Sequence, residues 1–117
     1  MKRHFDRTQR VNDLIQKSLA QILLQDMSDS RFRFVTITGV AITRDFAHAK
    51  IYVSMLIDEE NEIKDTIQAL NRAAKSLRYE LAQTIELRVM PELKFVYDES
   101  TAQGFKISKL IDDATRK

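Results

Sequence analysis

The segment that decides the fold is VTITGVAITRDFAHAKIYVSM, residues 35–55, which holds two short runs of β-branched and apolar residues. Such residues favour extended backbone, so each run predicts a strand. In the first run the apolar residues change parity part-way along, and they are Val35, Ile37, Val40 and Ile42. The change falls at Gly39, where a β-bulge is expected.

The second run alternates without interruption. Its apolar residues are Ala49, Ile51, Val53 and Met55, and the residues between them are Lys50, Tyr52 and Ser54. Strict alternation is typical of a strand with one buried face. The connection over residues 43–48 is short, so the two strands are expected to pair as a hairpin.

A helical spacing of apolar residues precedes the hairpin over roughly residues 7–25. The residues that follow this spacing are Val11, Leu14, Ile15, Leu19, Ile22 and Leu23. We expect Leu14, Leu19 and Ile22 to pack this helix on the sheet. The polar stretch from Asp26 to Arg33 indicates a loop.

Helical spacing also follows the hairpin and runs without a break over about residues 60–86. The apolar positions are Ile63, Ile67, Leu70, Ala74, Leu77, Leu81 and Ile85. The pattern alone therefore predicts one long helix. Pro91 ends it and begins a third strand, with Leu93, Phe95 and Tyr97 on one face. A loop over 98–104 and a last short helix over 105–114 complete the chain.

The predicted elements describe an α+β two-layer domain, a three-stranded sheet with helices on one face. The 117 residues suit a single domain over 1–117, with an ordered core over about 5–112. There is no cysteine, which excludes disulfides and thiolate metal sites and suits a reducing cytoplasm. No apolar run approaches the roughly 18–20 residues of a membrane span, and the charged first residues do not resemble a signal peptide.

Charge is unevenly distributed, although the formal net charge is only +2. Residues 1–17 and 71–88 are net basic, whereas residues 58–65 are acidic and suit the start of a helix. A basic face indicates a polyanionic partner, and an ordinary solvated surface of mixed charge is the competing explanation.

Catalytic chemistry has one weak candidate in this sequence. His48 lies close to Asp45 on the hairpin connection, and such a pair can act as a general acid–base in a small hydrolase. A surface histidine in a turn is the commoner occurrence. No metal-ligand spacing and no glycine-rich phosphate loop is present, so we expect no cofactor, no metal and no enzymatic activity.

Four motifs in a fixed order resemble the bacterial ribosome-binding factor A family. They are RTQRV at 7–11, RDFAHAKIYV at 44–53, LRVMPELKF at 87–95 and YDES at 97–100. The resemblance runs over about residues 3–112 and implies a KH-like (type II) fold of order α-β-β-α-α-β. Members of the family split the long helix at an Ala-x-Gly motif. The matching residues here are Ala73, Ala74 and Lys75, so lysine replaces the glycine.

The resemblance also implies a function. Members associate with the small (30S) ribosomal subunit, assist late maturation of 16S rRNA by binding RNA, and support growth in the cold, without catalysis. A cytoplasmic protein that is monomeric when free is expected. A non-catalytic protein–protein interaction module, docking through the acidic helix start and an apolar strand edge, is the alternative.

Candidate RNA-binding residues come from two sources. Arg7, Arg10 and Arg88 match basic positions of the family. Charge placement adds Arg3, Arg72, Lys75 and Arg78, because phosphate binding needs clustered cations more than a fixed motif. If the groups at 3–10 and 72–78 converge, they form one basic surface. The i, i+4 pairs Asp6–Arg10 and Asp13–Lys17 are a structural alternative for those cations.

Overall fold

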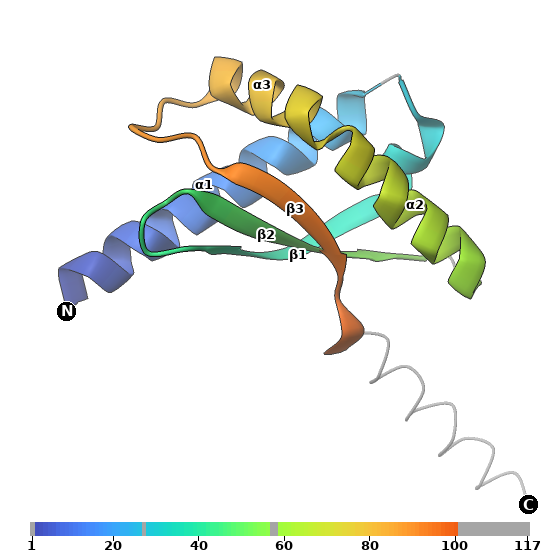
Figure 1. Cartoon of the computed structure of the whole chain (residues 1–117), viewed down its shortest axis with the longest axis horizontal. Coiled ribbons are helices and arrows are strands. Elements are labelled where there is room, and N and C mark those ends of the chain that lie inside the picture. Colours follow the sequence, from blue (N-terminus) through green and yellow to red (C-terminus); the bar gives the residue numbers. More distant parts are fainter. Residues whose placement is uncertain (1, 27, 57–58, 101–117) are drawn as a thin grey trace, which may run out of the picture.

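The computed structural model describes residues 2–26, 28–56 and 59–100, with side chains from residue 7 onward (Figure 1). Its elements in chain order are α1 (Lys2–Gln25), the 3-10 helix η1 (Ser30–Phe34), β1 (Val35–Ile42), β2 (His48–Met55), α2 (Glu60–Arg72), α3 (Ala74–Thr84) and β3 (Glu92–Tyr97). The helix expected over 105–114 lies outside the described residues.

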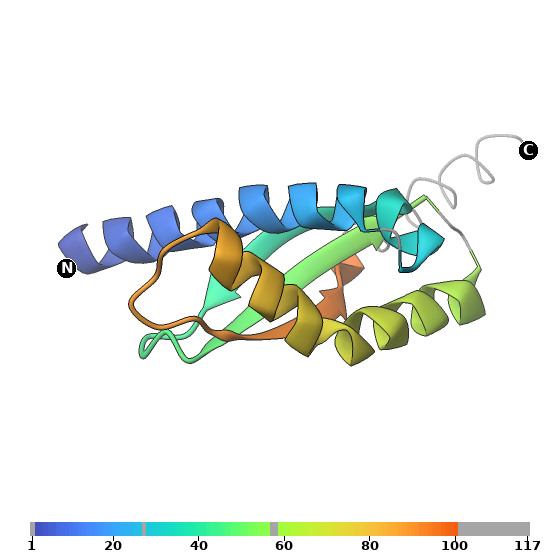
Figure 2. The same ribbon diagram turned by 90° about the horizontal axis from the view of Figure 1, so that it is seen from above.

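The three strands form one sheet in the order β1-β2-β3. β1 and β2 pair antiparallel, as the short hairpin connection predicts, whereas β2 and β3 pair parallel. Parallel neighbours need a crossover, which α2 and α3 supply. The helices lie over one face of the sheet in both views (Figures 1 and 2). The predicted α+β two-layer fold with α-β-β-α-α-β order is confirmed as KH-like.

The expected β-bulge is present at the predicted place. Ile37 pairs with Val53 and Gly39 pairs with Tyr52, so Thr38 has no opposite residue. Because of this extra residue, the apolar side chains in the second half of β1 point to the buried face of the sheet again. Ile37 is buried before the bulge, and Val40 packs against the core after it.

The core lies between the sheet and the helices. Ile15, Leu19 and Leu23 of α1 are almost fully buried, as are the inward residues of β2 and β3. The expectation for Leu14 is wrong, because this side chain is 40% exposed. A helix turns by about 100° per residue, so a stripe centred on Ile15 and Leu19 leaves Leu14 on its flank.

The stretch over 26–33 is not wholly a loop. η1 begins after Asp29, whose side chain accepts a hydrogen bond from the backbone N–H of Arg31 (3.0 Å). Within η1, Phe32 is buried at 2% exposure and joins the core between the ends of α1 and α2. Because its neighbours Arg31 and Arg33 are charged, this single apolar residue forms no periodic pattern in the sequence.

The long helix predicted by periodicity alone is wrong, and the break implied by the family resemblance is confirmed. α2 ends at Arg72 and α3 begins at Ala74. Ala73 between them has φ −86° and ψ −1°. Its N–H is shared between the carbonyls of Ala69 (3.0 Å) and Leu70 (3.1 Å). Ala73 has negative φ and Lys75 lies within α3, so neither residue adopts a backbone conformation that requires glycine, and the break forms with lysine at position 75.

Two side-chain clamps hold the helices against β3 on either side of the break. Asn71 accepts from the N–H of Phe95 (2.8 Å) and donates to its carbonyl (3.0 Å). Arg78 donates to the carbonyls of Met90 (2.7 Å) and Pro91 (3.0 Å). The clamps fix α2 and α3 separately, so the junction at Ala73 is set by tertiary contacts as well as by local sequence.

Candidate nucleic-acid interface

Arg72 and Lys75 are exposed cations placed directly at the helix break. Arg72 is the last residue of α2, and Lys75 lies in the first turn of α3. Within the described part of the chain, neither side chain forms a salt bridge. Unpaired cations on a fixed junction are available to phosphate oxygens without first breaking an internal ion pair.

η1 places two arginines beside the break, and one of them, Arg31, is already paired with a carboxylate. Arg31 forms a salt bridge with Asp29 (2.6 Å), and this hydrogen bond is the main cause that lowers the pKa of Asp29. α2 contacts η1, and the charge of Arg72 at the end of α2 also lowers the pKa of Asp29. Arg33 on η1 is also exposed. We call Arg31, Arg33, Arg72 and Lys75 the break surface. The sequence analysis missed its two arginines on η1 because it interpreted residues 26–33 as a loop.

Arg78 differs from Arg72 and Lys75 because its side chain bonds to the protein's own backbone. Its guanidinium donates to the carbonyls of Met90 and Pro91 at the entrance to β3. The side chain thus holds the α3–β3 connection in place. Its role in RNA binding stays a prediction, and some of its guanidinium N–H groups are already bonded within the protein.

Arg7 and Arg10 lie in the first half of α1 and are exposed, while Arg3 lies on the same helix with a side chain outside the description. Asp6 is outside it too, so the Asp6–Arg10 pair is untested. The Asp13–Lys17 ion pair is not formed; Asp13 accepts from the side-chain amide of Gln9 instead (2.9 Å).

The two predicted basic groups do not converge. Arg72 lies near Asp29, beyond the C-terminal end of α1, whereas Arg10 is fifteen residues before Gln25. At 1.5 Å per residue, that separates Arg10 from this end of the helix by roughly 22 Å. Both views place the start of α1 and the α2–α3 junction apart (Figures 1 and 2). The structure therefore does not bring Arg10 and Arg72 together on one continuous surface.

Arg88 is exposed in the connection between α3 and β3. It lines a hollow together with Ala82, Glu86 and Met90, among others. This connection lies on the same side of the molecule as the first half of α1 (Figures 1 and 2). Because this connection and the first half of α1 lie at the same end of the molecule, we call Arg7, Arg10 and Arg88 the α1 group.

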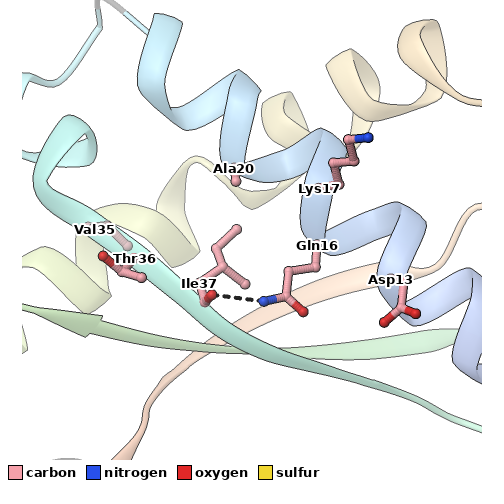
Figure 3. Close-up of a pocket in the computed structure, with 7 residues that line it drawn as sticks. All are labelled: Asp13, Gln16, Lys17, Ala20, Val35, Thr36 and Ile37. Carbon is pink, nitrogen blue, oxygen red and sulfur yellow. Dashed lines mark hydrogen bonds between the residues drawn. The ribbon is translucent and has the colours of Figure 1, made fainter.

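A groove runs between α1 and the edge strand β1. It is lined by Asp13, Gln16, Lys17, Ala20, Val35, Thr36 and Ile37 (Figure 3). Gln16 donates to the carbonyl of Ile37 (3.0 Å), and Asn12 accepts from the N–H of Ile42 (3.1 Å). These bonds satisfy backbone groups on the free edge of the sheet, which is a stabilising role.

The His48–Asp45 pair considered for catalysis is not formed. Asp45 accepts from the hydroxyl of Thr43 (2.7 Å) and the N–H of Ala47 (3.1 Å), and these bonds lower its pKa. His48 instead places Nδ1 3.6 Å from a carboxylate oxygen of Glu92. Asp45 therefore stabilises the hairpin turn.

Metal-binding and membrane-spanning features are both missing from the residues that the structure describes. Among them, no cluster of three or more histidine and carboxylate side chains is arranged to hold a metal ion. None of the described helices combines the length and the hydropathy that crossing a bilayer requires.

Comparison with known proteins gives consistent results. The model of the family "Ribosome-binding factor A" matches residues 7–111. The ribosome-binding factor A of Nitrosomonas europaea is 48% identical over 117 residues, covering 100% of this chain and 99% of that protein. That of Shewanella sediminis is 41% identical, covering 95% of this chain and 78% of the relative.

Solved structures with the same fold carry the same description. The crystal structure of ribosome-binding factor A from Thermus thermophilus aligns with TM-score 0.65 and 26% identity, covering 77% of this chain and 94% of that one. A Thermus thermophilus homology model fitted into the cryo-EM map of a 30S complex aligns with TM-score 0.60 and 27% identity. It covers 74% of this chain and 89% of that one.

Proposed function

This chain belongs to the ribosome-binding factor A family, and from that membership we propose that it binds the small (30S) ribosomal subunit. The Thermus thermophilus homologue fitted into a 30S complex supports this assignment. In this proposal the protein acts in the cytoplasm, is a monomer when free and has no catalytic role. Its direct ligand is 16S rRNA, and binding assists late maturation of that RNA and growth in the cold.

Among individual residues, those of the break surface give the proposal its main support. Arg72 and Lys75 are exposed, lack salt bridges within the described chain, and lie at a junction that Asn71 and Arg78 fix against β3. A junction held this way presents cations at defined positions, which lowers the entropic cost of phosphate binding. We assign the first RNA contact to this surface.

The α1 group forms a separate contact in this account. Arg7 and Arg10 lie in the first half of α1, and Arg88 lies in the α3–β3 connection; in this proposal they contact a second stretch of RNA backbone, and Arg3 stays a sequence-based candidate for the same contact. Arg78 contributes mainly by holding the α3–β3 connection that carries Arg88. Two separated cationic sites favour an RNA that is already folded, because both must be met at once.

The test is binding of the purified protein to 30S subunits at several salt concentrations. Phosphate contacts release counterions, so the logarithm of the affinity should fall linearly with the logarithm of salt, by about 0.7–0.9 per contact. Binding is measured both for subunits that contain immature 16S rRNA and for mature ones. No measurable binding to either kind of subunit would reject the function.

A protein–protein interaction module remains the second candidate because of one observation. Phe34 and Leu56 are 60% and 98% exposed, and they flank the paired residues Val35 and Met55. These two apolar side chains therefore lie at the same end of the hairpin. Binding through them would be nearly independent of salt, and loss of binding in Phe34→Ala together with Leu56→Ala would favour this candidate.

A further inference from the structure

Among the described residues, the helices cover one face of the sheet and no helix or strand covers the other (Figure 1). Strand register arranges the side chains of this open face in rows across the strands. Three rows, each written from β1 to β3, are Gly39, Tyr52 and Val96; Ala41, Lys50 and Lys94; and Thr43, which follows β1, with His48 and Glu92.

Lys50 and Lys94 are direct register partners on neighbouring strands, and both are exposed. Like charges in this position repel each other and destabilise a sheet. Their neighbour on β1 is Ala41, which offers no compensating charge. Within the described residues neither lysine forms a salt bridge. An anion bound between the two ammonium groups would relieve the repulsion.

The nearest carboxylates of the open face are engaged elsewhere. Glu92 lies 3.6 Å from the ring of His48. Asp98, at the end of β3, accepts from the hydroxyl of Thr38 (2.7 Å) and from the N–H of Ser100 (3.1 Å). Within the described residues, no salt bridge joins either carboxylate to Lys50 or Lys94.

Tyr52 lies in the row next to the lysines, with its side chain half-buried. Its partner on β1 is Gly39, which has no side chain to cover the ring. A Cβ at Gly39 would meet nothing within 4 Å, and its φ is not positive, so neither space nor backbone conformation requires glycine there. The glycine leaves open space beside an aromatic ring.

We propose that this open face is a further RNA-contact surface, which takes one single-stranded stretch. A base stacks on Tyr52 in the space above Gly39, and the adjoining phosphates lie between Lys50 and Lys94. The two rows are about 6.6 Å apart along β2, so a nucleotide and its neighbour span both. Aromatic stacking beside cations is a general mode of single-strand binding. The inference rests on the proposed RNA-binding function and adds a surface distant from the helices.

The test uses tryptophan reporters in the full chain, which contains no natural tryptophan. Tyr52→Trp reports on the open face, and Tyr79→Trp reports on the exposed outer side of α3. Short oligouridylate is the probe, followed by 30S subunits. We expect oligouridylate to quench the fluorescence of the Tyr52→Trp chain. Because Tyr79 lies one turn after Lys75 of the break surface, quenching of the Tyr79→Trp chain alone would place the oligonucleotide at the break and overturn the open-face proposal.

The two lysines are tested in the same reporter chain. Adding Lys50→Gln and Lys94→Gln to Tyr52→Trp should lower the salt slope of the quenching by about 1.4, since single-stranded contacts contribute about 0.7 each. An unchanged slope would show that no phosphate lies between the two ammonium groups.

Gly39→Val in the Tyr52→Trp chain gives an independent arm. A β-branched side chain should fill the space beside the ring and weaken oligouridylate binding by about tenfold, the size of one lost stacking contact. The fold should be retained, because valine favours a strand and its Cβ meets no atom within 4 Å. Thermal unfolding checks this directly.

The outcomes separate the two proposals. If the Tyr52→Trp chain binds 30S subunits but its fluorescence responds to neither probe, the open-face proposal is wrong and the proposed function stands. If the unmodified chain does not bind subunits at all, the proposed function fails first. Emission of the Tyr52→Trp chain that changes on dilution without RNA would show a second copy on this face, which also overturns the proposal. Unchanged binding after Gly39→Val would overturn the stacking geometry.

Discussion

The α2–α3 break and the first half of α1 both present exposed arginines, but different contacts hold them. At the break, Asn71 and Arg78 fasten both helices to the β3 side of the molecule. In α1, Arg7 and Arg10 project from a single helix that is anchored further along by buried apolar residues. A basic side chain near the break can therefore belong either to the binding surface or to the scaffold that supports it.

The anchoring of α1 gives the largest expected effect. Leu19→Ala removes a fully buried side chain and should lower the free energy of unfolding by about 2–5 kcal/mol. Leu14→Ala is the matched control on the same helix, because Leu14 is 40% exposed. It should cost about 1 kcal/mol or less. Chemical denaturation measures both, and equal losses would contradict the observed orientation of α1.

Loss of the two hydrogen bonds between Asn71 and Phe95 should have the next largest effect on stability. Asn71→Ala removes both hydrogen bonds to Phe95 and leaves part-buried backbone groups unsatisfied, so the loss should be about 2 kcal/mol. Hydrogen exchange at the amide of Phe95 should rise more than exchange at Ile51 in the centre of the sheet. Unchanged exchange at Phe95 would show that the clamp does not hold α2 in solution.

A substitution at Arg78 distinguishes most clearly between a role in stability and a role in RNA binding. Arg78→Lys keeps the charge but loses the planar guanidinium that reaches two carbonyls at once, so stability should fall by about 1 kcal/mol because the site is exposed. Affinity for 30S subunits at low salt should change less than in Arg72→Ala. A variant with full stability and reduced affinity would place Arg78 on the RNA instead.

Charge reversal on the break surface should have the smallest effect on stability. Arg72→Glu with Lys75→Glu should change the free energy of unfolding by about 0.5 kcal/mol or less per site. Neither side chain is buried or salt-bridged within the described chain. Lys64→Glu, an exposed position on α2 outside the break surface, is the control for altered net charge. Thermal melts of the wild type and the two variants should nearly coincide.

Most of the sheet was predictable because its signal is local. Alternation of side chains in β2 and the parity change in β1 directly reflect which face is buried, so the hairpin and the bulge at Gly39 were correctly predicted. Phe32 was missed because one apolar residue between Arg31 and Arg33 has no period. Leu14 was misplaced because its helical spacing fits a broad stripe, and only the packed sheet shows where the stripe is centred.

The break and the binding surface depend on contacts that no local pattern contains. The apolar positions of α2 and α3 continue in phase across Ala73, so only the family resemblance indicated a break. Charge placement selected Arg72, Lys75 and Arg78 alike as candidate RNA-binding residues, and all three are exposed, but it could not show that Arg78 also bonds to the backbone. The partners of Arg78 are carbonyls at positions 90 and 91, and this pairing exists only once β3 is in place.

The most direct test of the account is the salt dependence of 30S binding for Arg72→Glu with Lys75→Glu, measured beside wild type and Lys64→Glu. The account predicts weaker binding and a slope lower by about 1.4–1.8, because two phosphate contacts are lost. Lys64→Glu should retain the wild-type slope. Wild-type affinity and slope in the Arg72→Glu, Lys75→Glu protein would show that the helix break does not contact the RNA.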